Sequence, residues 1–183
     1  MELVKNFTQS KLVKNLFLVL VGSILLAISS KIKIPFYPVP MTMQTFVVLF
    51  LGVSLGYKIG LASVGLYLLE GIVGLPVFSN SPEKGVGLIY FTGPTMGYLI
   101  GFLIAVFFAG KFNYTNNLII NFLKLSFATS FIYILGMLWL GGLIGWDKPI
   151  FKLGAQPFLY AELFKILLAT FAINQIKKMK KIL

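Results

Sequence analysis

The chain of 183 residues contains no cysteine, no histidine and no arginine, and only five acidic residues. Without cysteine it can form no disulfide, and it offers no thiol nucleophile or thiolate metal ligand. Without histidine it also lacks the commonest side chain of general acid–base catalysis and the commonest metal ligand. These absences exclude most enzyme mechanisms. We therefore expect neither catalytic residues nor a bound metal.

Charge is scarce as well. Charged residues make up 11% of the chain and hydrophobic residues 58%, whereas soluble domains carry about 25% charged and about 45–50% apolar residues. The mean hydropathy is +0.92, too high for a water-soluble chain of this size. The sequence predicts an integral membrane protein with one domain over residues 1–183, and it argues against disorder and against nucleic-acid binding.

Six apolar segments follow one another along the chain. They predict an all-α membrane protein with six transmembrane helices, at about 12–33, 42–56, 58–75, 88–110, 118–143 and 158–176. A helix needs about 20 apolar residues to cross the hydrocarbon core. The second and third segments are short for this purpose and are separated only by the turn at 56–58, so we expect them to be tilted or partly lined by loops.

Fifteen of the 16 lysines indicate the orientation, because they flank the apolar segments instead of forming one patch. Ten lie on the side of the N-terminus and five on the other side, which are Lys31, Lys33, Lys84, Lys148 and Lys152. Lysine accumulates in cytoplasmic loops and contacts anionic lipid there. An even number of spans places both termini on one side. We therefore expect both termini in the cytoplasm of a multi-pass cell-membrane protein.

The three connections expected outside the cell are rich in proline, glycine and aromatic residues. They are 34–42 (IPFYPVPMT), 76–87 (PVFSNSPEKGVG) and 145–157 (GWDKPIFKLGAQP). Such segments cannot be helical throughout, and clustered on one face they indicate external loops that cap a small-molecule pocket. Ordinary helix-ending turns are the alternative.

Three ionisable residues lie well within apolar segments, namely Glu70, Glu162 and Lys165. Each costs about 2.5–3.5 kcal/mol at the bilayer centre, which favours a specific role. Glu162 and Lys165 are three apart and share a helix face. They form either a structural ion pair or the polar floor of a solute pocket. Glu70 is expected to pair with Lys165 or to line the same cavity.

Small residues predict close helix contacts. Gly93, Gly97 and Gly101 are spaced by four, as in a helix-packing face, and Ser23 and Ala27 give the first helix a similar strip. Packing within the chain and docking of another membrane protein both remain open for that strip. The sequence contains no phosphate-binding loop, so ATP-driven transport would require a partner that hydrolyses ATP.

Four motifs carry a family resemblance, in this order: IPFYPVPMTMQTF at 34–46, GLPVF at 74–78, GPTMGYLIGF at 93–102 and PFLYAELFKILLA at 157–169. From about residue 16 to 176 the chain resembles the BioY family, the biotin-binding S-components of energy-coupling-factor (ECF) transporters. The resemblance implies a six-helix fold whose first external loop closes over biotin. It also implies a transmembrane coupling subunit, two cytoplasmic subunits that hydrolyse ATP, and no cofactor.

The resemblance also assigns roles by position. Thr42 and Gln44 belong to the lid motif, and Asn80 and Tyr90 fall in the pocket region. Aromatic side chains that could form the apolar walls are Phe36, Tyr37, Phe78, Phe91 and Tyr98.

Glu162 and Lys165 occupy the family's polar pair at the head of the last helix. The family usually has Gly-Asp where this chain has Ala161-Glu162, which shifts the carboxylate by about one methylene and makes the role of Lys165 the firmer one. Ser23 and Ala27 resemble the strip that docks on the coupling subunit. Three alternatives remain, namely an S-component for another vitamin, a structural membrane subunit, and an intramembrane enzyme using Glu162 and Lys165. The last lacks a nucleophile–base arrangement.

Overall fold

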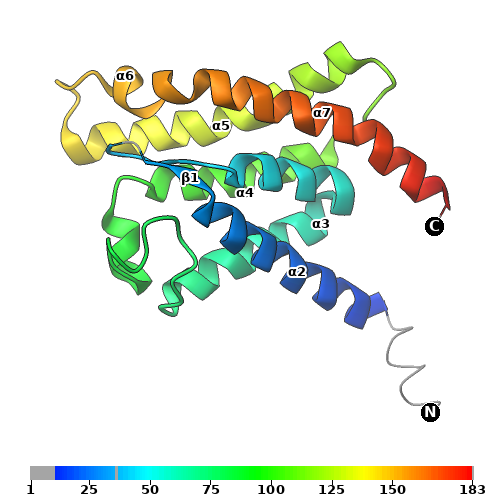
Figure 1. The fold of residues 1–183 in the computed structure, drawn as a ribbon, viewed down its shortest axis with the longest axis horizontal. Helices are drawn as coiled ribbons and strands as arrows, with labels where there is room; N and C mark the ends of the chain where they lie inside the picture. The colour runs from blue at the N-terminus through cyan, green and yellow to red at the C-terminus, as the bar shows by residue number, and fades with distance from the viewer. Residues whose placement is uncertain (1–10, 36, 183) are drawn as a thin grey trace.

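The computed structural model describes residues 11–35 and 37–182, and the described chain is almost wholly helical (Figure 1). A two-stranded antiparallel ribbon and two short 3-10 turns complete it. In chain order the elements are α2 (Lys11–Lys31), β1 (Lys33–Ile34), β2 (Met41–Thr42), α3 (Gln44–Ile72), η1 (Gly87–Thr92), α4 (Met96–Lys111), α5 (Leu118–Ile144), α6 (Ile150–Gly154), η2 (Gln156–Phe158) and α7 (Leu159–Ile182).

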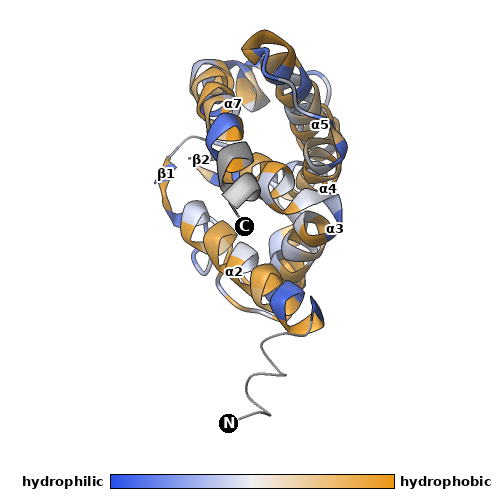
Figure 2. Ribbon diagram, turned by 90° about the vertical axis from the view of Figure 1, so that its right-hand side faces the viewer, coloured by the Kyte–Doolittle hydropathy of each residue, from blue (hydrophilic) through white to orange (hydrophobic). Residues whose placement is uncertain are grey.

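Hydrophobic residues predominate along the long helices (Figure 2), and many of them are exposed on the surface of the bundle. Within the described residues, α2, α3, α5 and the stretch Ile150–Ile176 are long and apolar enough to cross a membrane, and α4 is a shorter apolar helix of 16 residues. On α2, Leu16, Phe17 and Ile24 are all more than half exposed. Such surface is unfavourable in water, and it is suited to contact with lipid.

Helix α3 reverses direction at Gly56, whose φ of 78° and ψ of 169° interrupt the helix. Glycine adopts this conformation readily because it has no Cβ. A Cβ on Gly60 would lie 3.5 Å from the Cα of Gly52, whereas eight residues of straight helix span about 12 Å. The two arms of α3, 44–55 and 57–72, therefore fold back against each other at the turn expected between the second and third segments.

The long helices follow one another around the bundle in chain order, and the ribbon lies between α2 and α7 (Figure 2). Helix α4 packs closely on α5, because a Cβ on Gly97 or Gly101 would collide with the backbone of α5. The packing face predicted for these two glycines is thus present. Gly93 differs, because it ends η1 before α4 begins.

Several element boundaries differ from those expected. The segment 88–110 divides into η1 and an α4 that starts only at Met96, because Gly93 is extended and is followed by Pro94. Proline disfavours a helical conformation of the residue before it. The connection 145–157 contains the short helix α6, and the connection 34–42 contains the ribbon strands, so both are more ordered than plain loops.

The connections sort to opposite ends of the molecule (Figure 1). The start of α2, the bend at Gly56, the 112–117 connection and the end of α7 lie at one end. The ribbon and the connections 73–95 and 145–158 lie at the other end, which we call the loop end.

Candidate binding pocket

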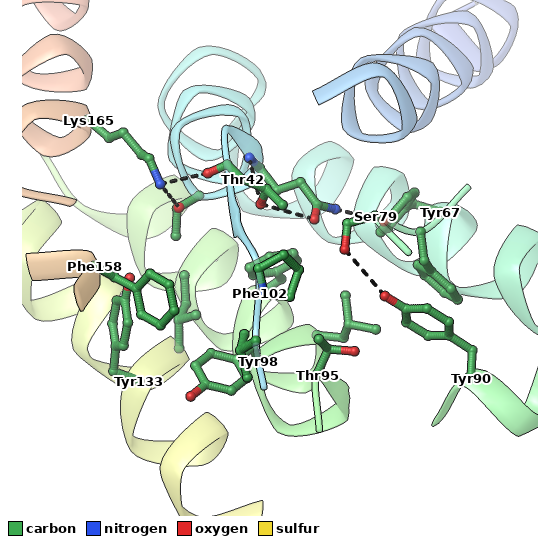
Figure 3. A pocket seen from close by; sticks show the side chains of 17 residues that line it. Thr42, Tyr67, Ser79, Tyr90, Thr95, Tyr98, Phe102, Tyr133, Phe158 and Lys165 are labelled. Carbon is green, nitrogen blue, oxygen red and sulfur yellow. Dashed lines mark hydrogen bonds between the residues drawn. The ribbon is translucent and has the colours of Figure 1, made fainter. Parts of the chain in front are cut away.

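A narrow pocket opens at the loop end, between the ribbon and helices α3, α4, α5 and α7 (Figure 3). Its free volume is about 60 Å³, whereas small-molecule sites usually measure about 300–1,000 Å³. Its walls must therefore separate to admit a ligand. The lining residues are Val39, Pro40, Thr42, Gln44, Thr45, Tyr67, Phe78, Ser79, Tyr90, Thr95, Tyr98, Leu99, Phe102, Ile132, Tyr133, Phe158 and Lys165.

Lys165 forms the polar end of the pocket. Its ammonium group donates to the carbonyl oxygen of Thr42 at 2.6 Å and to the hydroxyl of Thr45 at 3.2 Å. It lies 3.4 Å from Oε1 of Glu162, and the residue is only 5% exposed. The lysine on α7 is thereby joined to the end of the ribbon and to the start of α3.

Glu162 lies beside the lysine and does not line the pocket. Its Oε2 accepts hydrogen bonds from the hydroxyls of Tyr133 at 2.6 Å and Thr45 at 3.1 Å. Oε1 receives no hydrogen bond from the described residues. Burying an ion pair is unfavourable unless further hydrogen bonds compensate for lost solvation. The two hydroxyls supply this compensation, and Thr45 links both charges because it donates to Glu162 and accepts from Lys165.

Local sequence explains why these groups converge. Pro157 lies in η2, which leads directly into α7, and Glu162 falls in the first turn of that helix. A carboxylate is favourable there because the helix N-terminus carries partial positive charge. Thr42 ends the ribbon two residues before α3 starts at Gln44, so the beginnings of α3 and α7 meet under the ribbon.

Gln44 and Tyr67 form a second polar group in the pocket. The side-chain amide of Gln44 donates to the hydroxyl of Tyr67 at 2.7 Å, and its oxygen accepts from the hydroxyl of Thr42 at 3.2 Å. The Tyr67 hydroxyl in turn donates to the carbonyl of Val77 at 3.4 Å. The lid-motif residues Thr42 and Gln44 thus line the pocket and are connected through Tyr67 to the 73–95 connection.

Aromatic rings form the remaining walls (Figure 3). Phe78 stacks on Tyr90 with a centroid distance of 4.6 Å, and Tyr67 meets Phe78 edge-on at 5.2 Å. Tyr98 contacts Tyr133 edge-on, and its hydroxyl donates to the carbonyl of Gly154 at 2.8 Å. Phe78, Tyr90 and Tyr98, which the sequence suggests, all line the pocket.

Other candidates lie elsewhere. Asn80 lines a neighbouring cavity and accepts from Lys33 at 3.0 Å. Tyr37 is 85% exposed and forms no wall, and Phe36 lies outside the described residues. Glu70 does not pair with Lys165. It accepts a hydrogen bond from Ser23 on α2.

That same contact corrects the expectation for the first helix. Ser23 is fully buried against Glu70, so its side chain has no exposed surface to offer a partner. Ala27 is half-buried and packs partly against the core. Packing within the chain therefore explains the Ser23 position.

Sequence reasoning missed eleven of the lining residues, among them Thr45, Tyr67, Tyr133 and Phe158. A signal exists for two of them, because Tyr67 and Tyr133 bring hydroxyl groups into apolar helices. A buried hydroxyl needs a hydrogen-bond partner, and here the partners are Gln44 and Glu162.

The fold and the pocket define a class, a multi-pass helical membrane protein with a small pocket that is lined by polar and aromatic residues and lies beneath ordered connections. The chain belongs to the BioY family, whose model matches residues 3–181. The resemblance carried by the four sequence motifs is thereby confirmed.

Named relatives agree with this assignment. The chain is 34% identical to the probable biotin transporter BioY of Pyrococcus horikoshii, covering 83% of this chain and 89% of the relative. It is also 34% identical to the biotin transporter BioY of Thermotoga maritima, covering 85% and 91%. The crystal structure of the S-component for biotin from an ECF-type ABC transporter matches with a TM-score of 0.77 and 25% identity, covering 93% of this chain and 94% of that one.

Proposed function

We propose that this protein captures biotin at the outer face of the cell membrane and serves as the substrate-binding S-component of an ECF transporter. The observation that carries the proposal is the buried Lys165, held beneath Thr42 at the polar end of an aromatic pocket, in a chain of the BioY family. The protein is a transport subunit with no catalytic residues of its own, and we expect it to need no cofactor.

The chemistry of biotin suits such a pocket. Its ureido group offers two N–H donors and a strong carbonyl acceptor, and its bicycle and valeryl chain are apolar. Lys165 donates to a carbonyl or carboxylate oxygen of the ligand, and the oxygens of Thr42 and Gln44 accept from N–H groups. Phe78, Tyr90 and Tyr98 cover the apolar part. Glu162 does not contact the ligand and positions Lys165 through their ion pair.

Entry of biotin requires the ribbon to lift. The connection between its strands places Val39 and Pro40 on the pocket, and the narrow free volume of about 60 Å³ leaves no room for a bicyclic ligand. We propose that residues 34–42 act as the lid and that the hydrogen bond from Lys165 to Thr42 helps to close it.

For the membrane topology we propose six spans with both termini in the cytoplasm. Helices α2, α4, α5 and α7 and the two arms of α3 run between the two ends of the molecule and support this count (Figure 1). Because the chain has no cysteine, single cysteines can be introduced without further changes. A cysteine at Asn116 should resist a membrane-impermeant maleimide added to intact cells, and one at Lys148 should react. The opposite pattern would invert the orientation.

We propose as partners a transmembrane coupling subunit and two cytoplasmic ATPases, together with the surrounding lipid. Ala27 on α2 is retained as a candidate docking residue because it is only half-buried. Affinity purification from native membranes should recover a subunit with a phosphate-binding loop, and Ala27→Trp should lose that subunit while retaining biotin binding. Recovery of the same subunit with Ala27→Trp would remove this residue from the docking surface.

The decisive measurement is calorimetry on the detergent-purified protein with biotin, thiamine and riboflavin. Selective binding of biotin is the expected result. Selective binding of another vitamin would retain the S-component role and change the ligand. Failure of a demonstrably folded protein to bind any of the three would contradict the proposal and leave Glu162 and Lys165 as a structural ion pair.

A further inference from the structure

Side chains in the last turn of α2 donate hydrogen bonds to backbone carbonyl groups of the 73–95 connection. The hydroxyl of Ser30 donates to the carbonyl of Val77 at 2.7 Å. The ammonium group of Lys31 donates to the carbonyl oxygens of Phe78 at 2.7 Å and Ser81 at 2.9 Å. Lys31 therefore directs its charge away from the end of its own helix and across to the neighbouring connection.

Lys33, two residues further along in β1, donates hydrogen bonds to the same connection. Its ammonium group donates to the carbonyl of Ser79 at 2.6 Å and to the side-chain oxygen of Asn80 at 3.0 Å. The two lysines together thus hold four oxygen atoms contributed by residues 78–81. Hydrogen bonds from a charged donor are about twice as strong as neutral ones, and they offset the mutual repulsion of carbonyl groups gathered on one side of a turn.

The segment 78–81, which the two lysines hold, forms part of the wall of the pocket. Phe78 and Ser79 both line the pocket, and both contact Tyr90, by ring stacking and by a 3.4 Å hydroxyl–hydroxyl hydrogen bond respectively. A displacement of residues 78–81 would therefore carry an aromatic surface of the pocket with it.

Lys33 also belongs to the root of the ribbon. Its backbone is paired with Thr42 in the antiparallel register, and the carbonyl of Thr42 accepts the hydrogen bond from Lys165. One short stretch of ribbon thus connects the polar end of the pocket on α7 with the aromatic wall on the 73–95 connection. Neither Lys31 nor Lys33 lines the pocket itself.

We propose that Lys31 and Lys33 are positioning residues for ligand capture, which fasten the 78–81 wall to the root of the ribbon so that lid and wall close on the ligand as one unit. The inference rests on the proposed function and adds to it two residues that act without touching the ligand. Their main effect falls on ligand release, because the fastened lid and wall must open together before the ligand can leave.

The test compares Lys31→Met, Lys33→Met and the double variant with the unaltered protein in biotin dissociation and association kinetics. Methionine keeps the length and apolar stem of lysine and removes the donors. The double variant should release biotin about tenfold faster, the order expected for lost charge-assisted hydrogen bonds that water partly replaces, with association changed less than twofold. Lys31→Arg with Lys33→Arg should restore slow release, because arginine also donates to several oxygens.

Lys148→Met is the matched control, because Lys148 lies in another connection of the loop end and its side chain forms an exposed ion pair with Asp147. Unchanged dissociation in the folded double variant would overturn the inference, as would equally fast release from the control. Hydrogen exchange provides a readout that needs no ligand. Backbone amides of 77–81 should exchange faster in the double variant, and unchanged exchange would refute the fastening even if the unaltered protein failed to bind biotin.

Discussion

Two glutamates lie within apolar helices of this protein, in very different surroundings. Glu162 at the start of α7 is 4% exposed, accepts hydrogen bonds from two hydroxyls and lies 3.4 Å from an ammonium group. Glu70 near the end of α3 is half-buried and accepts one hydrogen bond from Ser23. Among the described residues, no ion pair includes Glu70.

The comparison separates the candidate binding site from a helix contact. Around Glu162, groups from α3, α5 and α7 converge next to a pocket. Glu70 joins only α2 to the second arm of α3, at a close contact where a Cβ on Gly22 would collide with Ser63. An acidic residue in an apolar helix thus indicates a site when a cation and a cavity share its position, and otherwise indicates a polar contact between helices.

The largest expected effect comes from a substitution that removes the ion pair of Glu162. Lys165→Met should weaken biotin binding at least about 100-fold, because it removes the buried ammonium donor and leaves Glu162 as an unpaired buried charge. For the same reason the variant should lose about 3–5 kcal/mol of stability. Calorimetry and thermal unfolding in detergent measure the two effects.

A second variant separates binding from stability. Lys165→Met combined with Glu162→Gln removes both charges, so most of the stability should return while biotin binding stays lost. If the double variant binds biotin like the unaltered protein, Lys165 has only a structural role.

A smaller effect is expected from Tyr133→Phe, which removes only the 2.6 Å hydrogen bond to Glu162. Loss of one hydrogen bond to a charged group should weaken biotin binding about tenfold, because the carboxylate then orients Lys165 less firmly. Equilibrium titration with labelled biotin measures this change. Tyr114→Phe serves as the control, since the Tyr114 hydroxyl donates to the backbone carbonyl of Ala109, near the end of α4 that lies away from the pocket. Equal weakening by both variants would contradict the special position of Tyr133.

Sequence alone predicted the polar end of the pocket better than its walls. Lys165 at that end of the pocket and Glu162 beside it were noticed because ionisable residues are rare and costly in apolar helices. Tyr67 and Tyr133 were missed because tyrosine does not interrupt an apolar run, so its hydroxyl is not noticed.

Irregular connections show the limit more clearly. Asn80 directly follows Phe78 and Ser79 in sequence, yet only the latter two line the pocket, because a turn directs neighbouring side chains to different sides. The proposed role of Lys31 and Lys33 could not be predicted either, because their partners are backbone carbonyls some 46 to 50 residues away. In contrast, Gly56 could be interpreted because its effect on the backbone is local. Gly97 and Gly101 could be interpreted because their spacing of four places them on one helix face.

The smallest effects on biotin affinity should come from substitutions around Glu70, in contrast to those around Glu162. Glu70→Gln and Ser23→Ala should each leave biotin affinity within about twofold, because neither residue lines the pocket. In a double-mutant cycle of unfolding, their coupling should be about 0.6 kcal/mol, the average measured for hydrogen bonds between membrane helices. A larger loss of biotin affinity in either variant would show that the α2–α3 contact is linked to the pocket, and that the two glutamates serve one site instead of two separate purposes.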